Sequence, residues 1–238
     1  MMTAYNNSTD LKMDTADAFA ALERGVYAAL ETYSNVHRGS GHYSMVTTEL
    51  FEQAREIALE YLGLNNRSHV VIFSTPAGAA DLTAKMEPGS FPLLSSADFG
   101  LPLGVRALAV RRSLLPKGTP GQVGGGTARL ISRDWILWAS PPDRFEAGTP
   151  AIINVIAFAR ALRLAQQSGN NIFTGTDSEK LSAKEILYHD ELVQLTGHEL
   201  LEKLRQSMIG RGLPVPTTRG LQPFINFDNS ASTPSFAP

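Results

Sequence analysis

Apolar residues in the first quarter of the chain recur at helical spacing. One set recurs every three or four positions: Phe19, Leu22, Val26 and Leu30. This set predicts a helix that begins at a cap formed by Asp14 or Thr15 and ends near Tyr33. A second set predicts a helix that stops at Gly63: Leu50, Ala54, Ile57, Ala58, Tyr61 and Leu62.

Short apolar runs predict strands further along. "HVVIF" (69–73) and "GVRALAV" (104–110) are typical of buried strands. "ARLIS" and "WILWA" flank Arg133 and Asp134, which indicates a hairpin. Residues 74–102 are broken by prolines and glycines and show no regular pattern.

The second half of the chain is predicted to be mainly helical. An apolar helix should run from about 151 to 167, and two capping boxes should begin one helix each, at Ser182 and at Thr196. Residues 213–223, "LPVPTTRGLQP", are expected to form an extended linker because the prolines disfavour helix. The mixed order of elements predicts an α/β fold.

Composition removes several classes of function. With 238 residues, 43% hydrophobic and 18% charged, the chain is typical of a soluble globular protein. A net charge of −2 gives no electrostatic signature of nucleic-acid or anionic-membrane binding. No membrane span or secretory signal is recognisable, so we expect a cytoplasmic protein. Cysteine is absent, which excludes disulfides and any cysteine nucleophile within these residues.

Two groups of residues are weak candidates for a binding site. The five histidines show no i, i+4 pair of the kind that binds zinc, so no metal site is predicted. Gly124, Gly125 and Gly126 precede a predicted strand rather than a helix. We therefore expect them to permit a sharp turn or a close approach to another chain, not to hold a nucleotide phosphate.

Two polar segments are better candidates. In "DRFEAGTP" (143–150), Thr149 would cap the following helix, and its hydroxyl with the free amides beyond it could hold an anion; the alternative is that it only caps. In "SNVHRGSGH" (34–42), Arg38 suits a carboxylate or phosphate, and His37 could stack on a ring or move a proton. The alternative there is an ordinary polar loop.

Together these segments resemble a known family. "YSNVHRGSGHYS", the helix "FEQAREIALEYLG", the strand "VVIF", "GGGTARL" and "PPDRFEAGTPAI" are similar to class V aminotransferases, and among them to the cysteine desulfurase-like branch. The resemblance runs with gaps over about residues 1–165. It implies a pyridoxal-phosphate (PLP) enzyme of fold type I, an amino-acid substrate and a homodimer, with His37, Arg38, Thr75 and Thr149 at the cofactor.

The resemblance also implies a domain division. Family members open with a strand and a motif like "LDNAATTP", which "FDNSASTP" (227–234) resembles, and the degenerate "YNNSTD" (5–10) stands where the same motif would open a first copy. We therefore expect a reduced class V-like domain at 1–212, a linker at 213–223 and the truncated start of a second domain at 224–238.

The sequence also departs from the family pattern at the residues that would hold the cofactor. The family holds its cofactor on a lysine in a Ser-x-His-Lys setting, and no such sequence occurs here; Lys85 is the nearest in order, with the wrong neighbours. Only residues 74–102 separate the two predicted strands, which is too short for the family's cofactor-binding βα units. "TPAG" (75–78) takes the place of the family's phosphate loop, but Pro76 lacks an amide donor.

Two functions follow as hypotheses. The chain is either a piece of a PLP-dependent enzyme without activity in isolation, or a non-catalytic dimerisation or regulatory module that docks on a complete class V domain encoded downstream. The fold expected in both cases is a small sheet whose two main strands are neighbours, covered by helices, because removing the family's intervening units brings those strands together.

Overall fold

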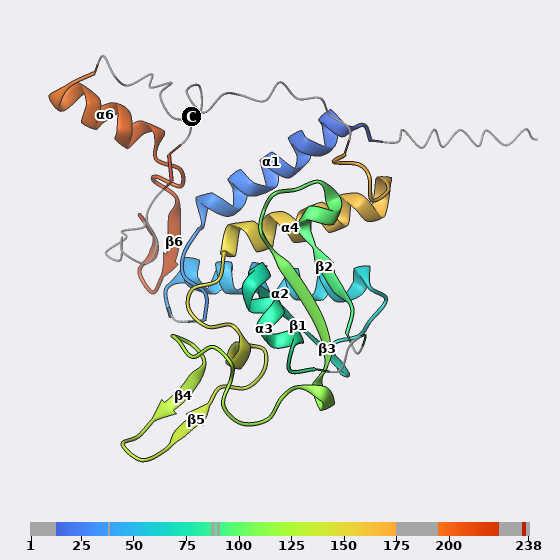
Figure 1. Cartoon of the computed structure of the whole chain (residues 1–238). Coiled ribbons are helices and arrows are strands. Elements are labelled where there is room, and N and C mark those ends of the chain that lie inside the picture. The colour runs from blue at the N-terminus through green and yellow to red at the C-terminus, as the bar shows by residue number, and fades with distance from the viewer. Residues whose placement is uncertain are drawn as a thin grey trace, which may run out of the picture.

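The computed structural model describes residues 13–37, 39–86, 89, 91–174, 195–223 and 235–236. A small sheet lies at its centre, and helices cover both faces of that sheet (Figure 1). The motifs at 5–10 and 227–234 and the capping box at Ser182 lie outside the described residues. The division into domains therefore stays a prediction.

Three antiparallel strands form the central sheet in the order β1–β3–β2. Their bounds are His69–Ser74 for β1, Arg106–Arg111 for β3 and Leu93–Ser95 for β2. The register sets His69 opposite Arg111 and Ser74 opposite Arg106. The two long strands predicted from the sequence are thus confirmed, and they are neighbours as expected.

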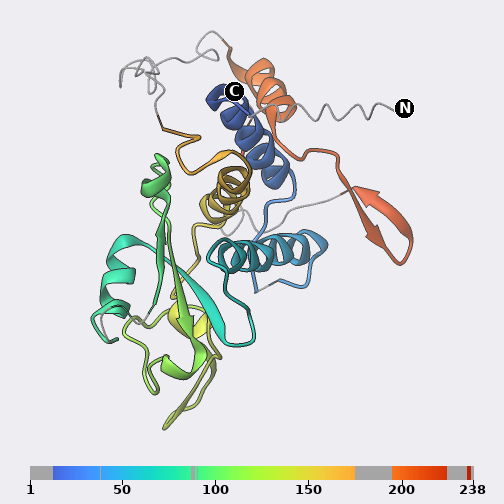
Figure 2. The ribbon, with the colours of Figure 1, turned by 90° about the vertical axis from the view of Figure 1, so that its right-hand side faces the viewer.

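Both faces of this sheet are buried, which explains why its strands are continuous apolar runs. Val71, Phe73 and Ala109 face the larger core, together with three helices. These helices are α1 (Thr15–Glu31), α2 (His42–Tyr61) and α4 (Ile152–Ser168). Figure 2 shows α1, α4 and α2 in successive layers on one side of the sheet, and α3 on the other.

The second core is smaller. Ile72, Leu108 and Val110 point to the opposite face of the sheet and pack with Leu82 of α3 (Pro76–Thr83) and with Leu115. Alternation along each strand therefore divides the same run of residues between two cores. Helix α3, β2 and the short turn η1 (Ser96–Phe99) occupy the segment 74–102, in which no regular element was predicted.

Local signals at the ends of the helices are borne out in part. Asp14 caps α1, because its Oδ1 accepts from the Asp17 amide at 2.8 Å. Helix α6 (Gly197–Ser207) does follow Thr196, but the Thr196 side chain makes no capping hydrogen bond, so the reciprocal cap predicted there is wrong. Thr196 precedes Gly197, which has a left-handed φ of 57°, and this conformation takes the chain out of the usual capping geometry.

Two hairpins lie outside the central sheet. Strands β4 (Ala128–Ile131) and β5 (Ile136–Trp138) form the predicted one, and it projects from the body of the molecule (Figures 1 and 2). Strands β6 (Pro214–Thr217) and β7 (Gly220–Pro223) form the other, in the segment expected to be an extended linker. The chain is extended there as expected, and it also pairs with itself, because a two-stranded hairpin consists of edges only, where proline is tolerated. Its role as a linker between domains stays a prediction.

None of the helices within the described residues is long and apolar enough to cross a membrane.

Candidate functional site

Arg55 is the centre of the candidate site. It projects from α2 toward the sheet and is only 5% exposed. Its two terminal nitrogens donate to the two carboxylate oxygens of Glu146 at 2.6 and 2.7 Å, which is a bidentate ion pair. Nη1 also donates to the Val71 carbonyl at 2.8 Å, and Nε donates to Glu52 Oε1 at 3.0 Å.

Two aromatic rings complete the surroundings of Arg55. Its guanidinium carbon lies 4.9 Å from the centre of the Phe51 ring and 5.2 Å from that of Phe73. Both distances are within the range of cation–π attraction. Burial alone would lower the pKa of Arg55, but the charges and hydrogen bonds of Glu146 and Glu52 outweigh it, and the pKa is raised. The guanidinium therefore stays charged inside the core.

Glu146 ties the "DRFEAGTP" segment to the sheet. Its Oε1 accepts from the Phe73 amide of β1 at 2.7 Å in addition to its bonds with Arg55. The side chain is 6% exposed, so the pair with Arg55 is shielded from solvent on both sides. One carboxylate thus joins α2, β1 and the loop ahead of α4.

His37 extends the same network toward solvent. Its Nε2 lies 3.3 Å from Glu52 Oε1, and its backbone is in the left-handed region at a φ of 58°. The His37 amide donates to Thr48 Oγ1 at 3.0 Å, and its ring meets Phe51 edge-on at 6.0 Å. The hydrogen bond to Glu52 raises the pKa of His37 against the opposing effect of burial, with a smaller contribution from Asp143.

The pKa of Glu52 moves in the opposite direction. Burial would raise it, but the hydrogen bond from His37 and the charge of Arg55 together lower it. Because its Oε1 lies against both basic side chains, Glu52 connects the exposed imidazole to the buried guanidinium. The chain of charges is His37, Glu52, Arg55 and Glu146.

A hollow of about 540 Å³ lies over this network, and we call it the Glu146 hollow. His37, Asp143 and Glu146 line it, together with Arg129 and Ser140 from the hairpin side. The two polar segments singled out in the sequence, 34–42 and 143–150, therefore share one face. Arg38 itself lies outside the described residues, so its predicted role stays untested.

A second, smaller hollow holds both threonines of the expected cofactor site, and we call it the threonine hollow. Thr75 and Thr149 line its volume of about 120 Å³. Thr75 caps α3, and its Oγ1 accepts from the Gly78 amide at 3.2 Å. Small-molecule pockets usually begin at ~300 Å³, so this hollow is small for a cofactor by itself.

Thr149 does not cap α4, and that prediction is wrong. The helix begins at Ile152, with Ala151 at its cap position. A tight turn intervenes, in which the Ile152 amide donates to the Pro150 carbonyl at 2.8 Å. Gly148, with a φ of 86°, turns the chain just before it.

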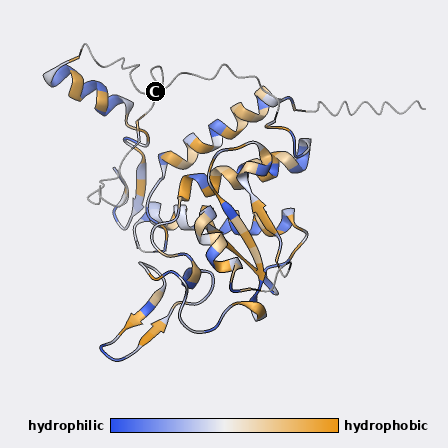
Figure 3. Cartoon of the chain, viewed as in Figure 1, coloured by the Kyte–Doolittle hydropathy of each residue, from blue (hydrophilic) through white to orange (hydrophobic). Residues whose placement is uncertain are grey.

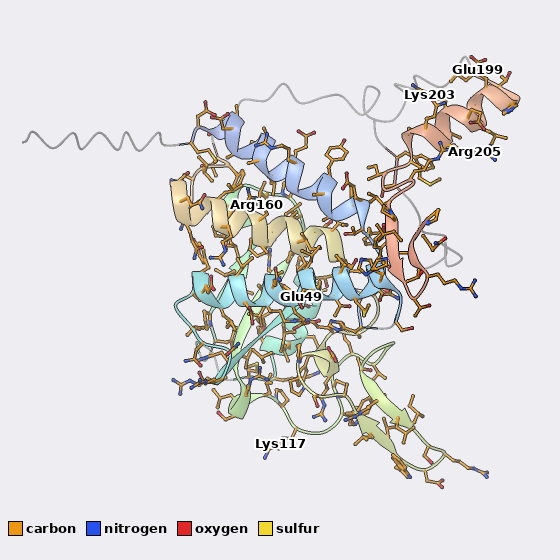
Figure 4. All side chains as sticks on the ribbon, turned by 180° about the vertical axis from the view of Figure 1, so that it is seen from behind. Glu49, Lys117, Arg160, Glu199, Lys203 and Arg205 are labelled. Carbon is orange, nitrogen blue, oxygen red and sulfur yellow. The ribbon has the colours of Figure 1, made fainter. Side chains whose placement is uncertain are left out.

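Lys85 is placed apart from these residues. Its Nζ pairs with Asp81 Oδ2 at 3.1 Å, one turn away on α3. It lines a different hollow of about 30 Å³ with Asp81 and Gly121. Figure 4 labels two other lysines, Lys117 on a loop at the lower edge and Lys203 on α6 at the far end. None of the lysines in the described residues lines either of the first two hollows.

The triple glycine holds the wall of the Glu146 hollow. A Cβ on Gly124 would lie 3.3 Å from both Ala147 Cβ and the Gly148 amide nitrogen, and Gly148 donates to the Gly125 carbonyl at 3.0 Å. Thr127 closes the turn, with Oγ1 donating to the Gly124 carbonyl at 2.7 Å. The glycines therefore permit a close approach, but to the "FEAGTP" segment of this chain, whereas the expected approach to another chain stays a prediction.

Sequence reasoning missed Arg55 and Glu52. Arg55 follows Phe51 by four residues and precedes Ala58 by three, so it lies on the apolar face of its helix. A charged residue at such a position is almost never fully buried without a partner. The place of Arg55 on the apolar face therefore could have indicated a buried ion pair. Glu146 in "DRFEAGTP" is the acidic residue that forms it.

Comparison with known proteins finds matches to the same family that the sequence motifs resemble. The family described as Aminotransferase class-V matches residues 93–209. A probable cysteine desulfurase of Staphylococcus aureus (strain N315) is 38% identical over 68 residues, which is 29% of this chain and 16% of the relative. One from Aeropyrum pernix is 33% identical over 104 residues, 40% of this chain and 25% of the relative.

A solved structure supports the same fold. The apo cysteine desulfurase of Thermococcus onnurineus NA1 aligns with a TM-score of 0.51 at 16% identity, covering 71% of this chain and 73% of that one. The findings support a class V aminotransferase or cysteine desulfurase-like family for this chain, and its architecture is the α/β architecture of fold type I. It matches at most a quarter of the length of the curated relatives named here.

Members of this family depend on PLP. The described residues do not fit covalent attachment of that cofactor, because none of their lysines lines the threonine hollow or the Glu146 hollow, and the amine of Lys85 is paired with Asp81 elsewhere. What these residues provide is a buried ion pair that fixes "FEAGTP", with His37 and two threonines arranged around it.

Proposed function

We propose that this chain is a class V aminotransferase-like module that does not carry out the family's chemistry by itself. The observation that supports this is the position of Lys85. Aldimine chemistry needs an activated lysine amine at the cofactor. Lys85 instead forms an i, i+4 ion pair with Asp81 and lines a hollow apart from Thr75 and Thr149.

Trapping the cofactor tests this proposal. The purified chain is mixed with PLP, reduced with borohydride and digested, and the peptides are examined by mass spectrometry. We expect no new aldimine absorbance and no stoichiometric adduct at any lysine. A complete cysteine desulfurase treated in parallel is the positive control. A stoichiometric adduct at Lys85 or at any other single lysine would contradict the proposal.

The exposed hairpin favours a more specific role. Strands β4 and β5 and the turn between them carry exposed large apolar side chains, and orange segments mark hydrophobic residues along both strands in Figure 3. The exposed set is Leu130, Ile131, Trp135, Ile136 and Leu137. Exposed apolar patches of this kind mark interaction sites, and a two-stranded hairpin is marginal unless something packs on it.

We therefore propose that the module docks through this hairpin on a complete class V domain. Ala128 and Arg129 of the hairpin also line the Glu146 hollow, so a partner held there would lie beside "FEAGTP". The family resemblance implies that Thr149 would then contact the partner's cofactor phosphate. The amino-acid substrate and the cytoplasmic location expected from the sequence stay predictions at this level.

Tryptophan fluorescence gives a direct test of docking. Both tryptophans of the chain, Trp135 and Trp138, belong to the hairpin segment. A partner domain whose tryptophans have been replaced should shift their emission to shorter wavelength and co-elute with the chain in size exclusion. Ile131→Ser with Ile136→Ser should abolish both effects. Leu221→Ser, at a 68% exposed site on β7, is the matched control. No shift and no co-elution at micromolar concentration would contradict docking.

A further inference from the structure

A second polar hollow lies at the opposite end of the central sheet. It has a volume of about 350 Å³ and is lined by Arg67, Ser68, His69, Arg111, Arg112 and Ser113. We call it the arginine hollow. β1 begins here at His69 and reaches the threonine hollow at Ser74, a separation of ~17 Å at ~3.4 Å per residue.

Strand pairing brings these residues together. β1 and β3 are antiparallel, and His69 lies opposite Arg111, so the start of one strand meets the end of the other. The Arg112 amide donates to the Ser68 carbonyl at 3.0 Å, and Arg112 Nε donates to the Asn66 carbonyl at 3.2 Å. The cluster is thus fixed by backbone contacts on both sides.

The loop before β1 is also ordered by its own side chains. Asn65 Oδ1 accepts from the Ser68 amide at 3.1 Å and from Ser68 Oγ at 2.9 Å. Ser68 Oγ lies 2.9 Å from His69 Nδ1. These bonds hold a hydroxyl and an imidazole at the hollow before any ligand arrives, which lowers the cost of binding.

The charge of the hollow is strongly one-sided. Three arginines line it, whereas its lining residues include no Asp or Glu, in a chain with a net charge of −2. Within the described residues, none of the ion pairs involves Arg67, Arg111 or Arg112. Uncompensated arginines gathered around one concavity repel each other unless an anion joins them.

We propose that the arginine hollow binds the phosphate group of a small phosphomonoester. Arginine presents a planar fork that matches phosphate oxygens, and the Ser113 hydroxyl adds a neutral donor. The volume falls within the range of small-ligand sites. The chain's negative net charge and the confinement of the cluster to one hollow favour a small ligand over a nucleic-acid strand, which requires a basic stripe.

Titration with two probes tests the proposal. Glycerol phosphate and inorganic phosphate are each added to ¹⁵N-labelled protein, and amide shifts are followed by NMR. We expect saturable shifts at residues 66–69 and 111–113 with both probes, and tighter binding of the ester if the neighbouring surface contacts its organic part. Equal affinity for the two would identify free phosphate as the ligand source. Shifts that do not saturate, or that occur elsewhere, would overturn the site.

Charge-removing variants distinguish a specific phosphate site from general electrostatic attraction of the anion to the protein. Arg67→Gln with Arg111→Gln should weaken binding about tenfold or more, because two charged donors are lost. Arg160→Gln with Lys203→Gln removes the same charge at exposed positions on α4 and α6 (Figure 4), neither of which lines the hollow, and should leave binding within about twofold. Equal weakening by both pairs would contradict the proposal. A circular dichroism melt of each variant confirms that it is folded.

Discussion

Arg55 and Glu146 form a buried bidentate ion pair although 91 residues separate them in the chain. The pair joins the helix that follows "NVHRG" to the segment "DRFEAGTP". It therefore explains why two motifs that are distant in sequence share one face of the molecule. Glu146 also receives the Phe73 amide, so the pair fixes the edge of the sheet as well.

Removing Arg55 should strongly destabilise the fold. Arg55→Ala leaves Glu146 buried without its charge partner, for which the expected loss is ~3–5 kcal/mol in the free energy of unfolding. Arg163→Ala is the matched control, because Arg163 pairs with Glu60 at 2.6 Å but both side chains are about half exposed. That control should lose less than ~1 kcal/mol. Urea unfolding measures both, and equal losses would contradict the role given to Arg55.

The coupling between the two residues is a separate prediction. In a cycle of Arg55→Met, Glu146→Gln and the double variant, we expect a coupling energy of ~0.5–3 kcal/mol, because each single change leaves the other polar group unmatched. Glu146→Gln keeps a carbonyl that can still accept from the Phe73 amide, so the cycle reports the ion pair more than that hydrogen bond. Losses that simply add, measured by urea unfolding, would show that the two side chains act independently.

The elements built from local patterns could be predicted from the sequence. The two buried strands, the hairpin around Arg133 and the start of α1 at Asp14 all follow from spacing, turn residues and caps. Even the adjacency of β1 and β3 could be inferred from the shortened segment between them. The predictions that failed concern helix caps at chain turns, namely those assigned to Thr149 and Thr196.

The candidate site was less predictable because it depends on long-range pairing. His37 and the "DRFEAGTP" segment could be singled out by composition, but nothing local states that Arg55 reaches Glu146. The neighbours of Lys85 in the sequence already argue against a role for it as the cofactor-binding lysine. Only its contact with Asp81 shows where its amine is placed. The arginine hollow likewise needs the strand register, because its residues come from two segments about 40 positions apart.

Stability should depend on pH through His37. The hydrogen bond to Glu52 raises the pKa of His37 above the ordinary 6.5. The stabilisation that the charged imidazole provides is therefore fully present below pH 6.5 and is lost as the pH rises through the folded-state pKa of His37. Glu52 has a lowered pKa, so its contribution is present above its ordinary 4.5 and is lost as pH falls through its folded-state value. The pair should therefore contribute most between about pH 4.5 and 6.5.

An NMR titration of the imidazole checks this sign. His37 should titrate above 6.5 in the intact chain and at a lower pH in Glu52→Gln, which removes the principal cause of the shift. A His37 pKa that does not respond to Glu52→Gln would contradict the contact.

Two glycine substitutions should change stability in opposite directions. Gly25 lies inside α1, and a Cβ there would meet only the flexible side chain of Arg160 at 3.4 Å, so Gly25→Ala should stabilise by ~0.5–1 kcal/mol through helix propensity. Gly124→Ala would place its methyl 3.3 Å from Ala147 Cβ and the Gly148 nitrogen, where backbone cannot yield easily, and should cost ~1–3 kcal/mol. Urea unfolding of the two variants side by side measures both effects.

Because Gly124 supports the segment that carries Glu146 and Thr149, Gly124→Ala should also perturb amide shifts across 143–150, whereas Gly25→Ala should not. A neutral Gly124→Ala would mean that "FEAGTP" is held by Arg55 alone.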